Sequence, residues 1–345
     1  MAYTTINKST DHFNIVQWTG NASTNAITGV NFRPDWVWGK SHTGGYSHQL
    51  YDVVRGATYS LKTNGNTAQE TLSTGLTSFD SDGFTLGSNT NINASGHTVT
   101  GWCWKAGNSA GSTNSDGSVT STVSANTTAG FSIVKFDPTG AACTIGHGLG
   151  VAPKVIIAKA FNRTFSWVWG GDAIGWTKYL EINSTQDVQT STARWNDTAP
   201  TSTVFSVKNE YNSGDNAIAY CFAEKTGFSK FGSYTGNGNV NGSFIYTGFK
   251  PNFILIKRTD ASENWVIEDG KQRSYNPSYA FFLADVNTIP TYGTGDGNQK
   301  IDLLSNGFKI RTTSVYSNAS GGNYIFMAFA KAPLVGSNNV PATAR

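Results

Sequence analysis

Histidines are the first side chains in this sequence that could bind a metal or support catalysis. The five histidines show no spacing typical of a metal site: His12, His42, His48, His97 and His147. No Cys-x-x-Cys pair occurs either. His42 and His48 flank a Gly-Gly-Tyr loop and could share a site, but a solvated loop is the simpler interpretation. We therefore predict no bound metal and no cofactor.

Carboxylates are the second candidates, because hydrolysis of a glycosidic bond uses two of them across a cleft. The candidates are Glu181, Asp197, Glu210, Glu263, Glu268 and Asp269. Nothing in the sequence brings two of them together. Asp80 and Asp82 imitate the start of a calcium loop, but the other ligands of an EF-hand are missing and a β-turn explains them. No Gly-x-Ser-x-Gly elbow, phosphate loop or Ser/His/Asp order is present, so the sequence predicts that the protein is not an enzyme.

Aromatic side chains in polar loops are the remaining candidates for binding. Aromatic residues make up 13% of the chain and charged residues only 14%. Four aromatic residues lie in predicted loops, where they could stack on a sugar ring beside Asn and Asp side chains: Tyr46, Trp176, Trp195 and Tyr292. Tryptophans at i, i+2 spacing in predicted strands, such as Trp36 and Trp38, are expected in the core instead.

The elements that position these loops come from a repeated strand signature. Residues 32–40, 151–159 and 249–257 each contain a Pro followed by a β-branched or aromatic run that ends in Lys. A Pro at the first strand position costs no ladder hydrogen bond, and the run indicates a strand buried on both faces. We expect the residue two positions after each Pro, such as Phe253, to lie in the core.

A second signature closes each repeat. An Asn/Ser/Gly turn leads into strands at residues 97–104, 217–223 and 323–330. Residues 79–86 and 303–310 show a strand, an Asp-Gly or Asn-Gly turn and a second strand, which indicates a hairpin. The chain is therefore predicted to be all-β, with three tandem diverged β-sandwich units of jelly-roll or lectin-like type.

The domain boundaries follow from these repeats and from composition. We predict an N-terminal arm (1–12), β-sandwich unit one (13–105), a Ser/Gly/Thr-rich linker (106–129), unit two (130–224), unit three (228–333) and a C-terminal tail (334–345). The composition of the linker is typical of a flexible segment, so unit one could lie apart from the others. Hardly any spacer joins units two and three, so they should dock tightly.

Charge and hydropathy exclude several classes of partner. The net charge is +3 and no basic cluster stands out, which argues against nucleic acid. No apolar run is long enough for membrane insertion, and the first residues lack a signal sequence, so release in the cytosol of the cell that makes the protein is expected. Three cysteines, Cys103, Cys143 and Cys221, are interpreted as small buried hydrophobic residues and not as a disulfide framework.

Several segments also match a known family. They are residues 11–13, 18–21, 32–38, 48–56, 76–87, 146–150, 227–232, 246–251, 303–311 and 341–345. On these segments the chain resembles a repeat-containing structural (tail or virion-associated) protein family of marine tailed bacteriophages. Gly39 departs from the family pattern, which has an aliphatic residue there, and this affects only packing. The resemblance implies a virion component with no known catalysis.

Three hypotheses about function follow. The first is a tail-fibre or receptor-binding component for host attachment, and the second is a capsid decoration (cement) protein. The third is a polysaccharide-binding or depolymerase tailspike. The expected partners are other virion proteins of the tail or capsid and a host surface glycan. A homo-oligomer is expected, with a trimer favoured, although no coiled coil or collagen-like shaft is present.

Overall fold

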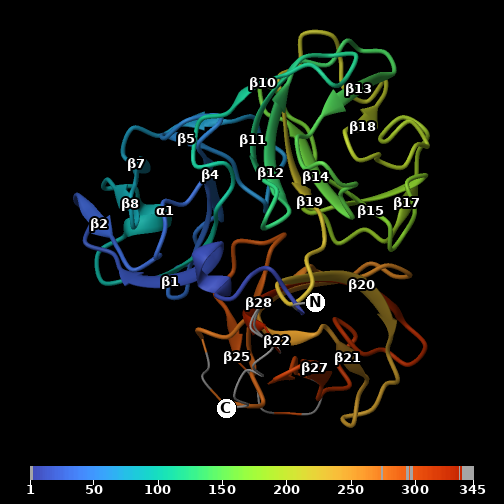
Figure 1. Ribbon diagram of the computed structural model, residues 1–345. Coiled ribbons are helices and arrows are strands. Elements are labelled where there is room, and N and C mark those ends of the chain that lie inside the picture. The colour runs from blue at the N-terminus through green and yellow to red at the C-terminus, as the bar shows by residue number, and fades with distance from the viewer. Residues whose placement is uncertain (1–2, 273–274, 293–294, 296–297, 334, 336–345) are drawn as a thin grey trace.

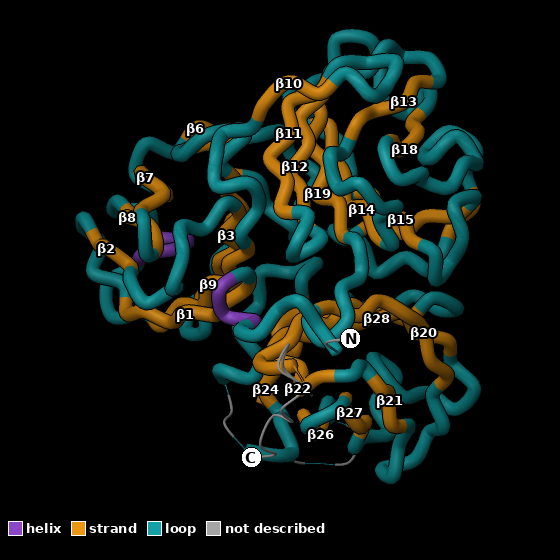
Figure 2. The backbone as a smooth tube through the Cα atoms, in the orientation of Figure 1, coloured by secondary structure: helices purple, strands orange, loops and turns teal. Residues whose placement is uncertain are grey.

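β-Strands form nearly all of the regular structure. The computed structural model describes residues 3–272, 275–292, 295, 298–333 and 335. Within these residues the helical elements are the short helix α1 (Thr90–Asn93) and one 3-10 turn (Ser9–Asp11), as Figure 2 shows. The prediction of an all-β chain is therefore confirmed. Three lobes that follow each other along the sequence surround a common centre (Figure 1).

Unit one (13–105) has a four-stranded sheet in the order β1-β9-β3-β4 and a three-stranded sheet in the order β2-β8-β7. A third sheet pairs β5 with β6. The strands are β1 (Phe13–Thr19), β2 (Asn25–Ile27), β3 (Trp36–Ser41), β4 (Gln49–Asp52), β5 (Tyr59–Ser60), β6 (Glu70–Thr71), β7 (Leu76–Asp80), β8 (Gly83–Leu86) and β9 (Thr98–Trp104). The hairpin predicted over residues 79–86 is the pair β7–β8.

Unit two (130–224) belongs to an eight-stranded sheet in the order β10-β11-β12-β19-β14-β15-β16-β17, with a two-stranded sheet of β13 and β18. The strands are β10 (Ser112–Asn114), β11 (Ser121–Asn126), β12 (Phe131–Phe136), β13 (Cys143–Gly146), β14 (Val155–Ala160), β15 (Val168–Gly171), β16 (Lys178–Glu181), β17 (Gln189–Thr190), β18 (Val204–Val207) and β19 (Ala217–Phe222). Two of these strands, β10 and β11, come from residues that precede the unit.

Unit three (228–333) has a six-stranded sheet in the order β20-β28-β22-β23-β24-β25 and a three-stranded sheet in the order β21-β27-β26. The strands are β20 (Ser229–Thr235), β21 (Phe244–Tyr246), β22 (Phe249–Arg258), β23 (Val266–Asp269), β24 (Ala280–Leu283), β25 (Thr291–Tyr292), β26 (Ile301–Leu304), β27 (Gly307–Ile310) and β28 (Asn323–Pro333). The hairpin predicted over residues 303–310 falls on β26 and β27.

The same strand order recurs in the three large sheets. In each one the last strand of the unit lies between the first strand and the strand that carries the Pro signature. The residue two positions after each Pro also takes the same register on that last strand: Trp36 opposite Trp104, Val155 opposite Phe222, and Phe253 opposite Phe329. The three Pro signatures therefore occupy equivalent positions.

A shared aromatic core joins the inner faces of the three large sheets. Trp36 of unit one stacks on Tyr220 of unit two, with ring centroids 4.4 Å apart. Trp104 of unit one meets Phe329 of unit three edge to face at 5.6 Å, and Phe222 of unit two lies 5.8 Å from the same ring. The other face of each large sheet packs against the small sheet of its own unit. The expectation that unit one could lie apart is therefore wrong.

The segment 106–129, expected to be a flexible linker, is part of the sheet of unit two. Strand β11 pairs with β12 from Ser121 opposite Phe136 to Asn126 opposite Phe131. Its residues are mostly Ser, Thr and Ala, and only Val123 is a buried large apolar side chain. Small polar residues are compatible with a strand whose partner supplies the packing, so composition alone was misleading here.

The two ends of the chain differ in what the structure describes. Residues 3–12, predicted as an arm, pack on unit three: the Tyr3 hydroxyl donates to the Gly248 carbonyl at 2.9 Å and Ile6 is buried in the shared core. The predicted tail (334–345) lies outside the described residues except for Val335. Among the described residues, no helix is both long and apolar enough to span a membrane.

Each Pro strand carries, one residue before its end, a buried lysine that connects two units. Every one of these Nζ atoms donates to a carbonyl six residues later in its own unit and to a carbonyl of another unit. The own-unit acceptors are Tyr46, Phe165 and Glu263, and the acceptors in the other unit are Asn287 for Lys40, Asn66 for Lys159 and Thr185 for Lys257. Unit one thus binds unit three, unit two binds unit one, and unit three binds unit two.

A second set of hydrogen bonds joins the three units in the same cyclic order. The ring nitrogens of His48, Trp167 and Trp265, which precede β4, β15 and β23, reach carbonyls of Leu283, Lys62 and Glu181 at 3.0, 2.7 and 2.9 Å. The Nδ1 atom of His48 accepts from Trp38 at 2.9 Å, so its Nε2 carries the proton and donates. These repeated contacts make the three units one rigid support for the surface loops.

Candidate binding surface

The four aromatic residues predicted to bind sugars are distributed over all three units. Tyr46 is half-buried in unit one, where its ring packs 5.3 Å from that of His97 and its carbonyl binds Lys40. Tyr292 belongs to β25 of unit three and is 50% exposed. Trp176 and Trp195 belong to unit two. The structure therefore does not assemble a single site from these four.

Trp176 and Trp195 are buried, which corrects the prediction that they are available for stacking. Their rings pack edge to face at 5.6 Å, and the Trp176 Nε1–H donates to Asp172 at 2.7 Å. The Trp195 ring covers Gly170 in β15, where a Cβ atom would lie only 2.4 Å from the indole. The loop folds back on its own sheet because this glycine leaves room for the indole.

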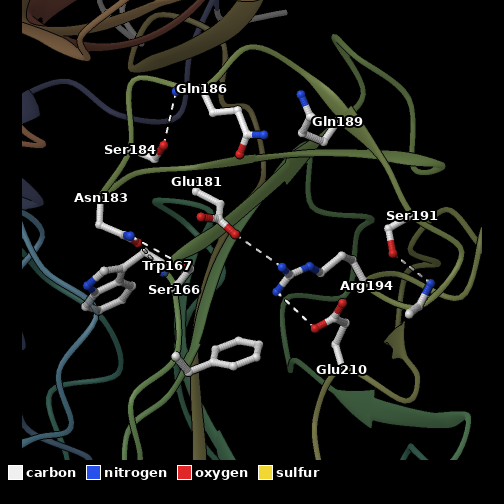
Figure 3. A network of polar contacts seen from close by, with 12 residues as sticks. Ser166, Trp167, Glu181, Asn183, Ser184, Gln186, Gln189, Ser191, Arg194 and Glu210 are labelled. Atoms are coloured by element: carbon white, nitrogen blue, oxygen red, sulfur yellow. Dashed lines mark hydrogen bonds and ion pairs between the residues drawn. The ribbon is translucent and has the colours of Figure 1, made fainter. Parts of the chain in front are cut away.

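Two of the candidate carboxylates do come together, on either side of Arg194 (Figure 3). The guanidinium lies 3.2 Å from a Glu181 oxygen and 3.5 Å from a Glu210 oxygen. It also lies over the ring of Tyr179, 4.5 Å from its centroid. Arg194 therefore fills the position between the carboxylates that a sugar would need for glycosidase chemistry. The arrangement is that of an ion-pair network that holds the loop.

The other candidate carboxylates are dispersed. Asp197 is exposed in a turn, and Glu263 lies at the joint between units two and three, where its N–H donates to Thr185 at 2.8 Å. Glu268 and Asp269 are adjacent and fully buried. Burial raises the pKa of both carboxyl groups. Asp269 accepts hydrogen bonds from the Trp102 indole of unit one and from two backbone N–H groups, which is a structural role.

The histidines and cysteines also have structural surroundings. Burial lowers the pKa of His42 to about 4 and that of His48 to about 3. All three cysteines are free and buried, as expected, and burial raises the pKa of the Cys103 and Cys221 thiols. Among the residues that the structure describes, no group of three or more His, Cys, Asp or Glu side chains could hold a metal ion.

Exposed apolar side chains concentrate on unit three. Seven of the nine large apolar side chains that are exposed in the described residues belong to this unit, so the surface of the molecule is polarised. They are Val240, Phe244, Tyr246, Tyr275, Ile289, Tyr292 and Val315. Tyr275 also contacts Tyr279, with the two hydroxyl groups 3.0 Å apart. Unit three is therefore the best candidate for a contact surface.

Strand β21 carries two members of this set at alternate positions. Phe244 is 45% and Tyr246 is 55% exposed, while Ile245 between them is buried. Burial and a hydrogen bond with Tyr246 raise the pKa of the neighbouring Tyr3 to about 12. We call Tyr3, Phe244 and Tyr246 the β21 aromatic cluster.

The repeats provide an internal comparison for this cluster. Ile245 pairs with Phe308 as Ile27 pairs with Phe84 in unit one, so Ala26 and Thr28 occupy the positions of Phe244 and Tyr246. Only unit three has large aromatic side chains at these two positions. Their exposure is therefore a property of unit three and not of the fold.

Sequence reasoning missed the β21 aromatic cluster. It also missed the contacts of Lys40, Lys159 and Lys257 with the neighbouring units, which we call the lysine joints. The pattern Phe-Ile-Tyr at residues 244–246 alternates like a half-buried strand, and its outward aromatics were a usable signal. A Lys at the end of three otherwise apolar strands was also visible. Nothing in the sequence indicated the acceptors of these lysines, because they are main-chain carbonyls.

Comparison with known proteins gives a family but no functional precedent. A family model described as a domain of unknown function, DUF7483, matches residues 8–333. No curated protein and no solved structure matches the chain.

Proposed function

The chain belongs to the DUF7483 family, a domain of unknown function, and we propose that it is a non-enzymatic structural protein of a bacteriophage virion surface, a tail-fibre or receptor-binding component. In this proposal it is made in the host cytoplasm and assembles with other virion proteins. It contacts a host surface glycan through unit three.

The observation that carries the proposal is the concentration of exposed apolar side chains on unit three. Units one and two bury nearly all their large aromatics, whereas unit three exposes Phe244, Tyr246, Tyr275 and Tyr292. Exposed aromatic rings on a rigid support suit stacking against sugar rings, with weak single contacts summed over several copies. A homo-oligomer, with a trimer favoured, would provide those copies.

We propose further that each unit is a diverged copy of one β-sandwich module. The support is the shared strand order of the large sheets and the separate apolar core that each unit forms with its small sheet. The equivalent positions of the three Pro signatures point the same way.

Capsid decoration is the second hypothesis. It ranks below host attachment because of how the N-terminal residues pack. An anchoring arm should extend away from the protein, but residues 3–12 pack on unit three through Tyr3 and Ile6. The depolymerase hypothesis comes third. Its best carboxylate pair, Glu181 and Glu210, is occupied by Arg194.

The test is adsorption of purified protein to host cells and to empty capsids in parallel. The double variant Phe244→Ala/Tyr246→Thr gives unit three the residues of unit one and should reduce cell binding at least about tenfold. Ala26→Phe/Thr28→Tyr in unit one is the matched control and should leave cell binding unchanged. Saturable capsid binding without cell binding would favour decoration, and binding to neither would reject both hypotheses.

A further inference from the structure

The first strand of unit three has an open edge. β20 is the outermost strand of its sheet, whereas its counterpart β12 in unit two is flanked by β11. Gly236 N–H donates to Gly322 in register with the β20–β28 pairing, so even-numbered residues bond to β28. The backbone groups of Phe231 and Ser233 therefore point away from the sheet.

A groove runs along this open edge, between units two and three. It consists of two adjoining hollows of about 360 and 540 Å³ that share Ala173 and Ser233. Trp169, Phe231 and Phe326 provide apolar lining in the first hollow. The groove thus combines backbone groups that point away from the sheet with apolar contact area.

The four charged side chains that line the first hollow form two ion pairs. Lys154 pairs with Asp172 at 2.5 Å, and Lys230 pairs with Glu224 at 2.6 Å. The second Glu224 oxygen lies 3.4 Å from the Phe231 nitrogen and occupies part of the strand edge. An occupant that pairs with Phe231 and Ser233 would displace this long contact, and it would meet no unpaired charge on these four side chains.

The chain itself shows what fits such an edge. In unit two the corresponding edge of β12 is covered by the antiparallel strand β11, with the uncharged sequence Ser-Thr-Val-Ser-Ala-Asn. That strand comes from the 24-residue segment 106–129, which precedes unit two. Residues 224–228 join units two and three directly, so no such segment precedes β20.

We propose that the groove along β20 is a docking site for an extended strand of another polypeptide. The strand adds antiparallel to β20 as β11 does to β12, and it is uncharged and rich in Ser, Thr and Val. Main-chain hydrogen bonds to Phe231 and Ser233 provide affinity, and the apolar lining receives alternate side chains. The site does not depend on the proposed role in host attachment.

The probe is a synthetic peptide with the sequence of residues 119–128, which includes β11. Hydrogen exchange of the full-length protein is measured with and without the peptide. The expected result is at least about tenfold slower exchange for Phe231 and Ser233, with no change in β1. No change at these two amides would overturn the proposal.

Two variants test the geometry. Ser233→Pro removes only the outward N–H and should abolish the protection of Phe231, whereas Gln17→Pro at the equivalent position of β1 should have no effect on it. Ala173→Trp fills the groove without changing β20 and should also abolish protection, which keeps the test valid if Ser233→Pro unfolds. Protection that survives in Ala173→Trp would contradict the proposal.

Two other outcomes would assign the groove elsewhere. Slower hydrogen exchange of Phe231 and Ser233 with a host polysaccharide, but not with the peptide, would identify a sugar site and overturn strand addition. Protection of these two amides that increases with protein concentration in the absence of peptide would identify a second copy of the chain as the occupant. That result would also overturn the proposal.

Discussion

The Nζ atom of Lys257 lies 3.0 Å from the carbonyl oxygen of Thr185, 72 residues earlier in the chain and in a different unit. The pairs Lys40–Asn287 and Lys159–Asn66 repeat this relationship at the two other joints. Each joint therefore places a buried ammonium group against main-chain carbonyls. The free energy of unfolding of the whole protein should therefore depend on whether these lysines are protonated.

We expect stability to rise with pH above neutrality. Burial lowers the pKa of Lys159 to about 7 and the pKa values of Lys40 and Lys257 to about 8. Between these values and the unfolded value of about 10.4, the unfolded chain binds more protons, so the free energy of unfolding increases with pH. Lys159→Met should reduce this slope by its own share, on the order of one-third.

Urea unfolding of the wild type and Lys159→Met between about pH 6 and pH 10 measures this slope. Lys178→Met, which changes an exposed lysine, is the control and should keep the wild-type slope. An unchanged slope in Lys159→Met would show that this lysine does not titrate in the folded protein.

Tyr220→Phe should weaken the joint between units one and two. The Tyr220 hydroxyl donates to Asp52 at 2.8 Å, and both side chains are fully buried. Loss of a buried hydrogen bond to a carboxylate costs about 1.5–3 kcal/mol. Denaturant unfolding measures the loss, and Tyr59→Phe, which changes a partly exposed tyrosine, should have no effect. A loss below about 0.5 kcal/mol would contradict the buried bond.

Phe253→Ala should destabilise the whole molecule in one transition. Phe253 is 2% exposed and contacts Trp102 and Trp104 of unit one in the shared core. Truncation of a buried Phe costs about 3–5 kcal/mol. Phe244→Ala, at an exposed Phe of the same unit, should change stability by less than about 0.5 kcal/mol. Separate melting of unit three in calorimetry would contradict the shared core.

Glu268→Gln should stabilise the protein at neutral pH. Burial raises the pKa of Glu268 well above its usual value, and one of its oxygens accepts from Ser278 at 3.1 Å. A raised pKa means that the folded state holds the proton, so stability is lost as pH rises above about 4.3. Gln keeps the shape without the charge and should flatten this decline, as urea unfolding would show. Glu70→Gln, at a partly exposed ion pair, should not flatten it.

Local chemistry made much of the fold predictable. The Pro-led strands and the Asp-Gly and Asn-Gly hairpins were recognisable because their turn residues lie next to the strands that they connect. β11 was missed because its small polar residues resemble a linker until β12 is alongside. Trp195 was misjudged because its burial depends on Gly170, in a strand that precedes it by about 25 residues.

The joints could not be predicted for a different reason. The lysines were visible, but main-chain carbonyls carry no residue-type signal, so their partners depend on how the three units meet. The exposure of Phe244 and Tyr246 likewise depends on which described segments pack against β21. Both features arise from tertiary structure.

The shared core limits how this chain can evolve. A unit whose inner face contributes rings to two neighbours cannot be exchanged alone, and a substitution at Asp269 would leave the Trp102 indole in another unit without its acceptor. Between units two and three, the Trp169 indole contacts the sulfur of Met327, so a different pair of side chains meets there. In the part of the chain that the structure describes, the small outer sheets make no such side-chain hydrogen bond to another unit. Variation between relatives should therefore accumulate on the outer sheets, while the inner faces change only in matched pairs.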